Sequence, residues 1–305
     1  MAAAKTLRER AGGKWQIPAV LLSLALLGTA IHRAEREQRT TPEAADLVCR
    51  EFESAHAGGV PKSAGPEPTR MAVETLDLIL RDSAVFTPEA PEFQDALFLL
   101  GDIHLSEGAF ERGISVLEEA LERYPHDPRA ARAKFLLADA YRQSALALER
   151  ESGDPAPASD RPRMRSEATA RFSRAAGLFA ELVENLSTDE GVGPMQPGLR
   201  ELLAKHARLY QADCLFELGR QSEAVALYET AAFIYRDEPS ALSAYVQIVN
   251  CRLSMGQLAE ARTALRRARY LLQIIPDSAF DEVHAGQNRR EWERYIDWLT
   301  RSDLF

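Results

Sequence analysis

Residues 97–110 read LFLLGDIHLSEGAF, and this stretch holds two glycines with different expected roles. Gly101 interrupts an apolar helical pattern, where glycine costs about 1 kcal/mol relative to alanine, so its presence needs a reason. Gly108 follows that helix and suits the left-handed turn that ends it. A second helix is expected at about 109–123, before Pro125. The stretch therefore predicts a helical hairpin whose helices come close together at Gly101.

The same hairpin pattern returns further along the chain, with small residues at matching positions. The steps from Gly219 to Gly256, from Ala224 to Ala261 and from Ala231 to Ala268 are all 37 residues. Gly219 and Gly256 match Gly108 and are expected in the turn after the first helix, where a left-handed backbone suits glycine. The alanines are expected at helix crossings, where a larger side chain would overpack the contact at a cost of about 1–3 kcal/mol. Several markers that keep one spacing indicate a repeated helix pair.

The first unit resembles a tetratricopeptide repeat (TPR). The residues at the positions of that pattern are Leu97, Leu100, Gly101, His104, Leu117, Ala120 and Pro125. His104 stands where the pattern has Tyr and is expected to be a packing residue, and Gly113 replaces the usual small Ala. The resemblance covers residues 93–270 closely and 42–84 loosely. It implies an all-α fold, a TPR-like α-solenoid of about four or five antiparallel helix pairs.

The repeat pattern also predicts how the chain is divided. TPR-like helices are expected at 42–84, and the TPR solenoid at 93–275 carries loop insertions at 151–165 and 187–198. Both loops are rich in Pro and Gly, and the first contains the basic run RPRMR. An amphipathic helix at 288–300 is expected to cap the last apolar face of the stack.

The amino terminus is predicted to cross a membrane. Residues 1–14 form a basic tail, residues 15–32 contain no Asp, Glu, Lys or Arg, and residues 33–41 form a charged linker. The uncharged run is at the lower limit of the roughly 17–25 residues that span a bilayer. We therefore expect a single-pass signal anchor, with the amino terminus cytoplasmic and the TPR region exported. Cleavage of this segment as a signal peptide, giving a secreted protein, is the alternative.

Composition and motifs point away from several functional classes. The net charge of −9 argues against a nucleic-acid partner. The three cysteines form no CxxC pair, and Cys214 and Cys251 hold the same position in consecutive units, where a small buried residue is expected. No phosphate-binding glycine loop, HExxH or GxSxG motif is present. The sequence therefore predicts no enzyme, cofactor, metal site or small-molecule substrate.

The resemblance implies a binding groove, because the first helix of each TPR lines the concave face of the stack. Two positions four residues apart would face it. The first is held by Phe98, Phe135, Leu209 and Val246, and the second by Asp102, Asp139, Asp213 and Asn250. An apolar stripe beside a row of carboxylates would suit a peptide segment with apolar and basic side chains. Alternatively, the aspartates make local hydrogen bonds or keep the groove soluble.

Together these features predict a membrane-anchored scaffold or adaptor that binds other proteins through its groove. The layout of anchor, linker and exported repeats is similar to that of bacterial envelope TPR proteins, which serve cell-envelope assembly or maintenance. A permanent helical accessory subunit of a membrane complex is a second hypothesis. An enzyme built on a helical solenoid is a third.

Overall fold

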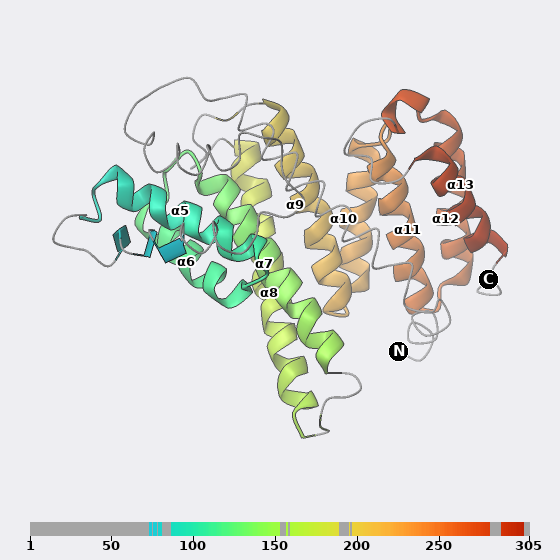
Figure 1. The fold of residues 1–305 in the computed structure, drawn as a ribbon. Helices are drawn as coiled ribbons and strands as arrows, with labels where there is room; N and C mark the ends of the chain where they lie inside the picture. The colour runs from blue at the N-terminus through green and yellow to red at the C-terminus, as the bar shows by residue number, and fades with distance from the viewer. Residues whose placement is uncertain are drawn as a thin grey trace. The chain divides into compact units, whose positions relative to one another are not determined.

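The computed structural model describes residues 73–74, 76–77, 79–80, 87–152, 157, 159–188, 195, 197–280 and 288–301 (Figure 1). These residues form helices joined by turns, and no strand occurs among them. The predicted tail at 1–14, the anchor at 15–32, the linker at 33–41 and most of the helices at 42–84 lie outside this part. No helix of the described residues is both long and apolar enough to span a bilayer.

The helices of the described residues follow one another in pairs. They are α5 (Pro91–Ser106), α6 (Phe110–Arg123), α7 (Ala130–Glu151), α8 (Arg161–Thr188), α9 (Pro197–Glu217), α10 (Gln221–Ile234), α11 (Pro239–Ser254), α12 (Leu258–Ile274) and α13 (Arg289–Arg301), with a 3₁₀ helix at Asp277–Phe280. They belong to two compact units that divide within α9, between Leu203 and Ala204. Consecutive helices from α5 to α8 pack against each other in one unit, and those from α10 to α13 do so in the other. The predicted all-α fold of helix pairs is confirmed.

The α5–α6 hairpin is as close as Gly101 predicts. A Cβ atom built on Gly101 would lie 2.4 Å from Cδ2 of Leu117, which is fully buried in α6. A Cβ atom on Gly113 would lie 2.4 Å from Cδ2 of Leu105 in α5. A Cβ atom at either position would force the facing leucine to move. The observed packing of the hairpin therefore requires glycine at both positions. His104 is also buried in this hairpin, as expected of a packing residue, and burial lowers its pKa.

Three glycines end the first helices of their hairpins with a left-handed backbone. The φ angles of Gly108, Gly219 and Gly256 are 75°, 76° and 74°. In the first turn, the Gly108 N–H donates to the Leu105 carbonyl oxygen at 3.0 Å. Glycine adopts this conformation without the steric cost that a Cβ atom brings. The predicted role of these glycines is confirmed.

The loop predicted at 151–165 is shorter than expected. Helix α7 continues to Glu151, and α8 already begins at Arg161, so the basic run RPRMR lies on a helix. Pro162 is in the first turn of α8, where the missing N–H of proline costs no intrahelical hydrogen bond. The Met164 N–H donates to the Asp160 carbonyl oxygen at 3.0 Å, which closes that first turn. The loop predicted at 187–198 is also trimmed, because α8 ends at Thr188 and α9 begins at Pro197.

The unit from Ala204 onward has its own apolar core. The repeat-marking alanines of this unit are all buried, namely Ala224, Ala231, Ala261 and Ala268. Cys214 and Cys251 are buried free cysteines, as predicted, and burial raises the pKa of the Cys251 thiol to about 12. Trp292, Ile296 and Leu299 of α13 pack into the same core.

Candidate functional site

The structure places the four apolar candidate positions on the first helices of the pairs. Phe98 is on α5, Phe135 on α7, Leu209 on α9 and Val246 on α11. The side chains of Phe98, Phe135 and Val246 are buried, and only Leu209 is partly exposed. Phe135 packs edge-on against Phe179 of α8, with ring centroids 5.7 Å apart. The apolar stripe that the sequence predicts is therefore mostly part of the core, because the neighbouring helices cover it.

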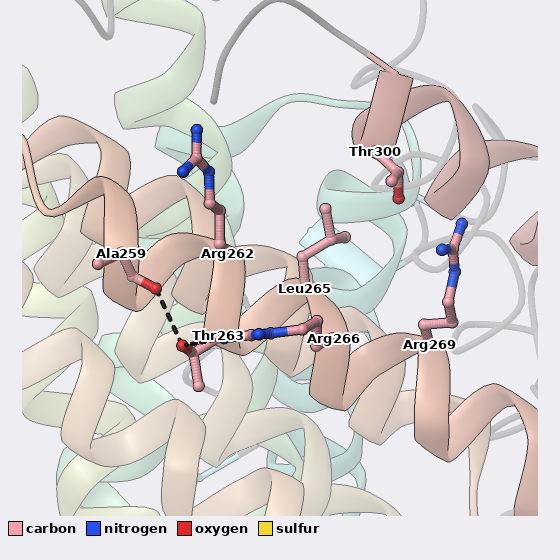
Figure 2. A pocket seen from close by; sticks show the side chains of 7 residues that line it. All are labelled: Ala259, Arg262, Thr263, Leu265, Arg266, Arg269 and Thr300. Atoms are coloured by element: carbon pink, nitrogen blue, oxygen red, sulfur yellow. Dashed lines mark hydrogen bonds between the residues drawn. The ribbon is translucent and has the colours of Figure 1, made fainter.

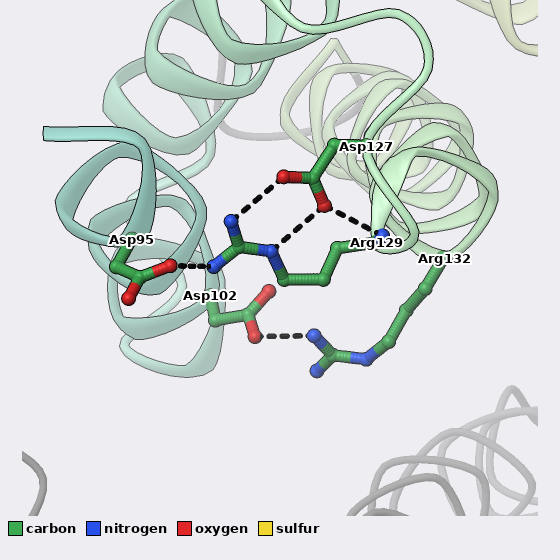
Figure 3. A network of polar contacts seen from close by, with 5 residues as sticks. All are labelled: Asp95, Asp102, Asp127, Arg129 and Arg132. Carbon is green, nitrogen blue, oxygen red and sulfur yellow. Dashed lines mark hydrogen bonds and ion pairs between the residues drawn. The ribbon is translucent and has the colours of Figure 1, made fainter. Parts of the chain in front are cut away.

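The first carboxylate position, Asp102, belongs to a charged network between α5 and the start of α7 (Figure 3). Arg132 Nη1 donates to Asp102 Oδ2 at 2.6 Å. Arg129 Nη1 donates to Asp95 Oδ1 at 2.5 Å, and Arg129 Nη2 donates to Asp127 Oδ2 at 2.8 Å. We call these five residues the α5–α7 network. Its two cations hold three carboxylates in fixed positions.

Arg129 is held in this network from several sides. Its guanidinium carbon lies 4.4 Å from the centroid of the Phe98 ring, which is a cation–π contact. The backbone N–H of Arg129 donates to Asp127 Oδ1 at 2.7 Å, so Asp127 also orders the entrance to α7. Burial alone would raise the pKa of Asp127, but its hydrogen bonds and charge contact with Arg129 together lower it. Both groups are therefore charged at neutral pH.

The second carboxylate position, Asp139, is buried and paired within its own helix. Arg142 Nη2 donates to Asp139 Oδ1 at 2.6 Å, and Gln143 Nε2 donates to Asp139 Oδ2 at 2.6 Å. The Arg142 side chain is buried as well. Charge-assisted hydrogen bonds compensate two buried charges here, and removing one partner would leave the other unpaired. Asp139 therefore stabilises α7 internally.

The corresponding positions in the later unit are also engaged. The Tyr228 hydroxyl of α10 donates to Asp213 Oδ1, and burial raises the pKa of Tyr228 well above its ordinary value. Asn250 Nδ2 donates to Gln247 Oε1 at 2.9 Å within α11. Every residue of the predicted polar row thus has a partner inside the chain. The alternative in which these aspartates make local hydrogen bonds describes the row well.

Part of the polar row nevertheless stays accessible. The Asp102 side chain is 25% exposed and that of Asp95 46% exposed. Asp213 and Asn250 are also partly exposed. The face of α5 thus presents carboxylates that two arginines have already ordered. Such a face can accept hydrogen bonds from a polar or basic partner without further reorganisation of the protein.

Sequence reasoning missed the cations of this site. Arg129 and Arg132 are at the beginning of α7 and reach the carboxylates of α5, which lie about 30 residues earlier. The run DPRAAR at 127–132 was the available signal, because arginines at the start of a helix can face the preceding helix pair. In the described part of the chain, no three His, Cys, Asp or Glu side chains gather where a metal ion could bind.

Comparison with solved structures finds loosely similar helical repeats. MamA MSR-1 is 18% identical, with a TM-score of 0.45, and the match covers 75% of this chain and 96% of MamA. A Podosopora anserina kinesin light chain with nearly identical TPR-like repeats is 16% identical, with a TM-score of 0.46 and coverages of 75% and 97%. Acl4, the assembly chaperone of RpL4, is 18% identical, with a TM-score of 0.41 and coverages of 86% and 93%.

Comparison of the sequence with protein families identifies the family of this chain. No curated protein matches the chain. The profile of the tetratricopeptide repeat matches residues 72–128, 98–160 and 167–241, which together make up more than half of the chain. The matched segments include the hairpin with Gly101 and the α9–α10 pair. The chain belongs to the tetratricopeptide repeat family.

Proposed function

We propose that this protein is a non-catalytic scaffold that binds other proteins through the first helices of its repeats. The α5–α7 network supports this role most directly. It offers partly exposed carboxylates on Asp95 and Asp102, held in place by Arg129 and Arg132. Preordered polar groups lower the entropic cost of binding a partner.

The chemistry of this face favours a partner with basic side chains. The α5–α7 network contains three carboxylates and two guanidinium groups, so its own charge is negative. A lysine or arginine of the partner could bond the outer carboxylate oxygens while Arg129 and Arg132 keep their contacts. Because Phe98 and Phe135 are buried, recognition by this face is polar rather than apolar.

The test compares two double variants that each remove two negative charges. Asp95→Asn with Asp102→Asn alters the α5–α7 network. Glu92→Gln with Glu122→Gln alters two exposed carboxylates outside it. Partners of each full-length chain are captured from cells by chemical crosslinking and identified by mass spectrometry, and thermal melts check that both variants fold.

We expect proteins captured by the parent chain and by the control variant to be lost, or reduced about tenfold, with the network variant. Equal capture by the two folded variants would refute the role of this face. Retention of a single stoichiometric partner by all variants would favour the accessory-subunit hypothesis instead.

We further propose that residues 15–32 anchor the protein in a membrane and that the repeats are exported, in a role in cell-envelope assembly or maintenance. The support is the uncharged run behind a basic tail. Leu24→Arg places a charge in the middle of this run, where insertion costs about 2.5–3.5 kcal/mol. The variant should leave the membrane fraction, whereas Leu7→Arg, in the tail, should not. Amino-terminal sequencing of the mature chain would distinguish the retained anchor from a cleaved signal peptide.

A further inference from the structure

The exposed face of α12 carries three arginines at helical spacing, on a different part of the protein from the α5–α7 network. We call Arg262, Arg266 and Arg269 the arginine stripe. Together with Leu265 of α12 and Thr300 of α13, they line a pocket of about 520 Å³ (Figure 2). Residues three and four apart lie on one side of a helix, so the three guanidinium groups serve one surface. The stripe extends over about 10 Å of helix.

The lining of this pocket is basic although the protein is acidic. None of the residues that line it is a carboxylate, while the whole chain has a net charge of −9. Arg269 Nη2 donates to Asp297 Oδ1 of α13 at 2.6 Å, at the edge of the pocket. Within the described residues, Arg262 has no hydrogen bond or ion pair. The pocket thus has positive charge that the neighbouring described side chains leave largely uncompensated.

The two threonine hydroxyls of the pocket are engaged within the protein, and Thr263 also orients Arg266 of the stripe. Thr263 Oγ1 donates to the Ala259 carbonyl oxygen at 2.9 Å and accepts from Arg266 Nη2 at 3.1 Å. Thr300 Oγ1 donates to the Ile296 carbonyl oxygen at 2.7 Å. Both hydroxyl protons are therefore used within their own helices, and the guanidinium groups supply the donors for a ligand.

We propose that the arginine stripe binds an acidic segment of a protein partner. Guanidinium groups bind carboxylates with two parallel hydrogen bonds, and this chemistry suits Asp and Glu side chains. The donors lie in a row along one helix, which matches carboxylates spaced along a peptide. A single phosphate would instead require donors that converge on one point. The stripe belongs to the other unit of the chain than the α5–α7 network, and it takes a partner of the opposite charge.

Binding of a defined probe to the full-length chain tests the proposal. The probe is a fluorescein-labelled peptide of alternating Glu and Ala residues, and the same peptide with Gln for Glu is the negative probe. Arg262→Gln with Arg266→Gln removes two charges from the pocket. The matched control, Arg267→Gln with Arg290→Gln, removes two exposed charges of α12 and α13 that do not line it.

We expect fluorescence anisotropy to show acidic-peptide binding that weakens roughly fivefold to tenfold in the stripe variant and less than about twofold in the control. Binding should also weaken with added salt. Equal loss in both variants, or equal binding of the Gln peptide, would overturn the proposal. Binding of vesicles with anionic lipid or of inorganic phosphate, without binding of the acidic peptide, would overturn it as well.

A second pair of variants tests whether Arg269 takes part in binding, through an expected gain in affinity for the acidic peptide. Asp297→Asn removes the carboxylate that holds Arg269, and Glu293→Gln makes the same charge change at an exposed position of α13. If Arg269 takes part in binding, Asp297→Asn should bind the acidic peptide about twofold to fivefold more tightly than Glu293→Gln. No difference between these two variants would exclude Arg269 from the site.

Discussion

The α5–α6 and α11–α12 hairpins build the same crossing from different side chains. In the first hairpin, Gly101 meets Leu117 so closely that no Cβ atom fits. At the equivalent positions of the last hairpin, Val249 and Leu265 are both side chains of substantial size, and both are buried. A small residue is therefore not required at this position by the repeat itself. What decides the size that fits is the room that the surrounding side chains leave at each crossing, because protein interiors are tightly packed.

The largest effect is expected where a charge enters a crossing. Ala224 of α10 holds the position of Gly113 and is fully buried, so Ala224→Glu would bury a carboxylate without a partner. We expect the free energy of unfolding to fall by about 3–5 kcal/mol. Urea unfolding followed by circular dichroism measures this change. Ala226→Glu, two residues along and exposed, is the control. Similar stability of the two variants would contradict the assignment of the crossing.

Two Gly→Ala variants with opposite expected effects on stability test the glycine contact, and both effects are smaller than that of Ala224→Glu. Gly101→Ala should destabilise the first hairpin by about 1–3 kcal/mol, less the helix preference of alanine, because Leu117 must move. Gly177→Ala in α8, where nothing lies within 4 Å of the new Cβ atom, should stabilise the protein by about 0.5–1 kcal/mol. Thermal melts of both variants measure the shifts. Stabilisation by Gly101→Ala would show that the crossing has room to spare.

The turns that lead into α7 and α11 differ in their acidic residues. Asp127 is bonded to Arg129 before α7, whereas Asp237 before α11 is exposed. Asp127 bonds Arg129 and its backbone N–H, so Asp127→Ala should cost about 1 kcal/mol at neutral pH. The pKa of Asp127 is lower in the folded state than its ordinary value of 3.8. This contribution is therefore fully present above pH 3.8 and is lost as the pH falls through the folded-state pKa. Unfolding curves over a pH series measure it, with exposed Asp237→Ala as the comparison.

The smallest effect concerns the buried thiols of the later unit. Cys214 and Cys251 should not react with a maleimide in the native protein, because both are buried and the pKa of Cys251 is about 12. Both should react after unfolding in denaturant. Peptide mapping by mass spectrometry distinguishes them from Cys49. Rapid native labelling of Cys251 would show that the α11–α12 core opens readily.

Much of the fold followed from local patterns. Gly108, Gly219 and Gly256 were predicted as left-handed turns, because few residues other than glycine adopt that backbone conformation. The loop was predicted to continue to residue 165, because the Pro- and Gly-rich composition of residues 151–165 concealed that a helix begins at Arg161 with Pro162 in its first turn. The candidate site was harder to predict. The sequence predicted the positions of Phe98 and Asp102 on the first helix of the hairpin. It did not predict the burial of Phe98 or the hydrogen bond of Asp102.

The sequence by itself determined the helices, their turns and the small residues at their crossings, because these depend on backbone preferences and on spacing within a repeat. Only the tertiary structure decided what the polar side chains do. Asp102 bonds Arg132, 30 residues away, and Asp213 bonds Tyr228, 15 residues away. The arginine stripe likewise became one wall of a pocket only when α13 packed beside α12. Such contacts depend on the directions of side chains from different helices, which a periodic pattern does not encode.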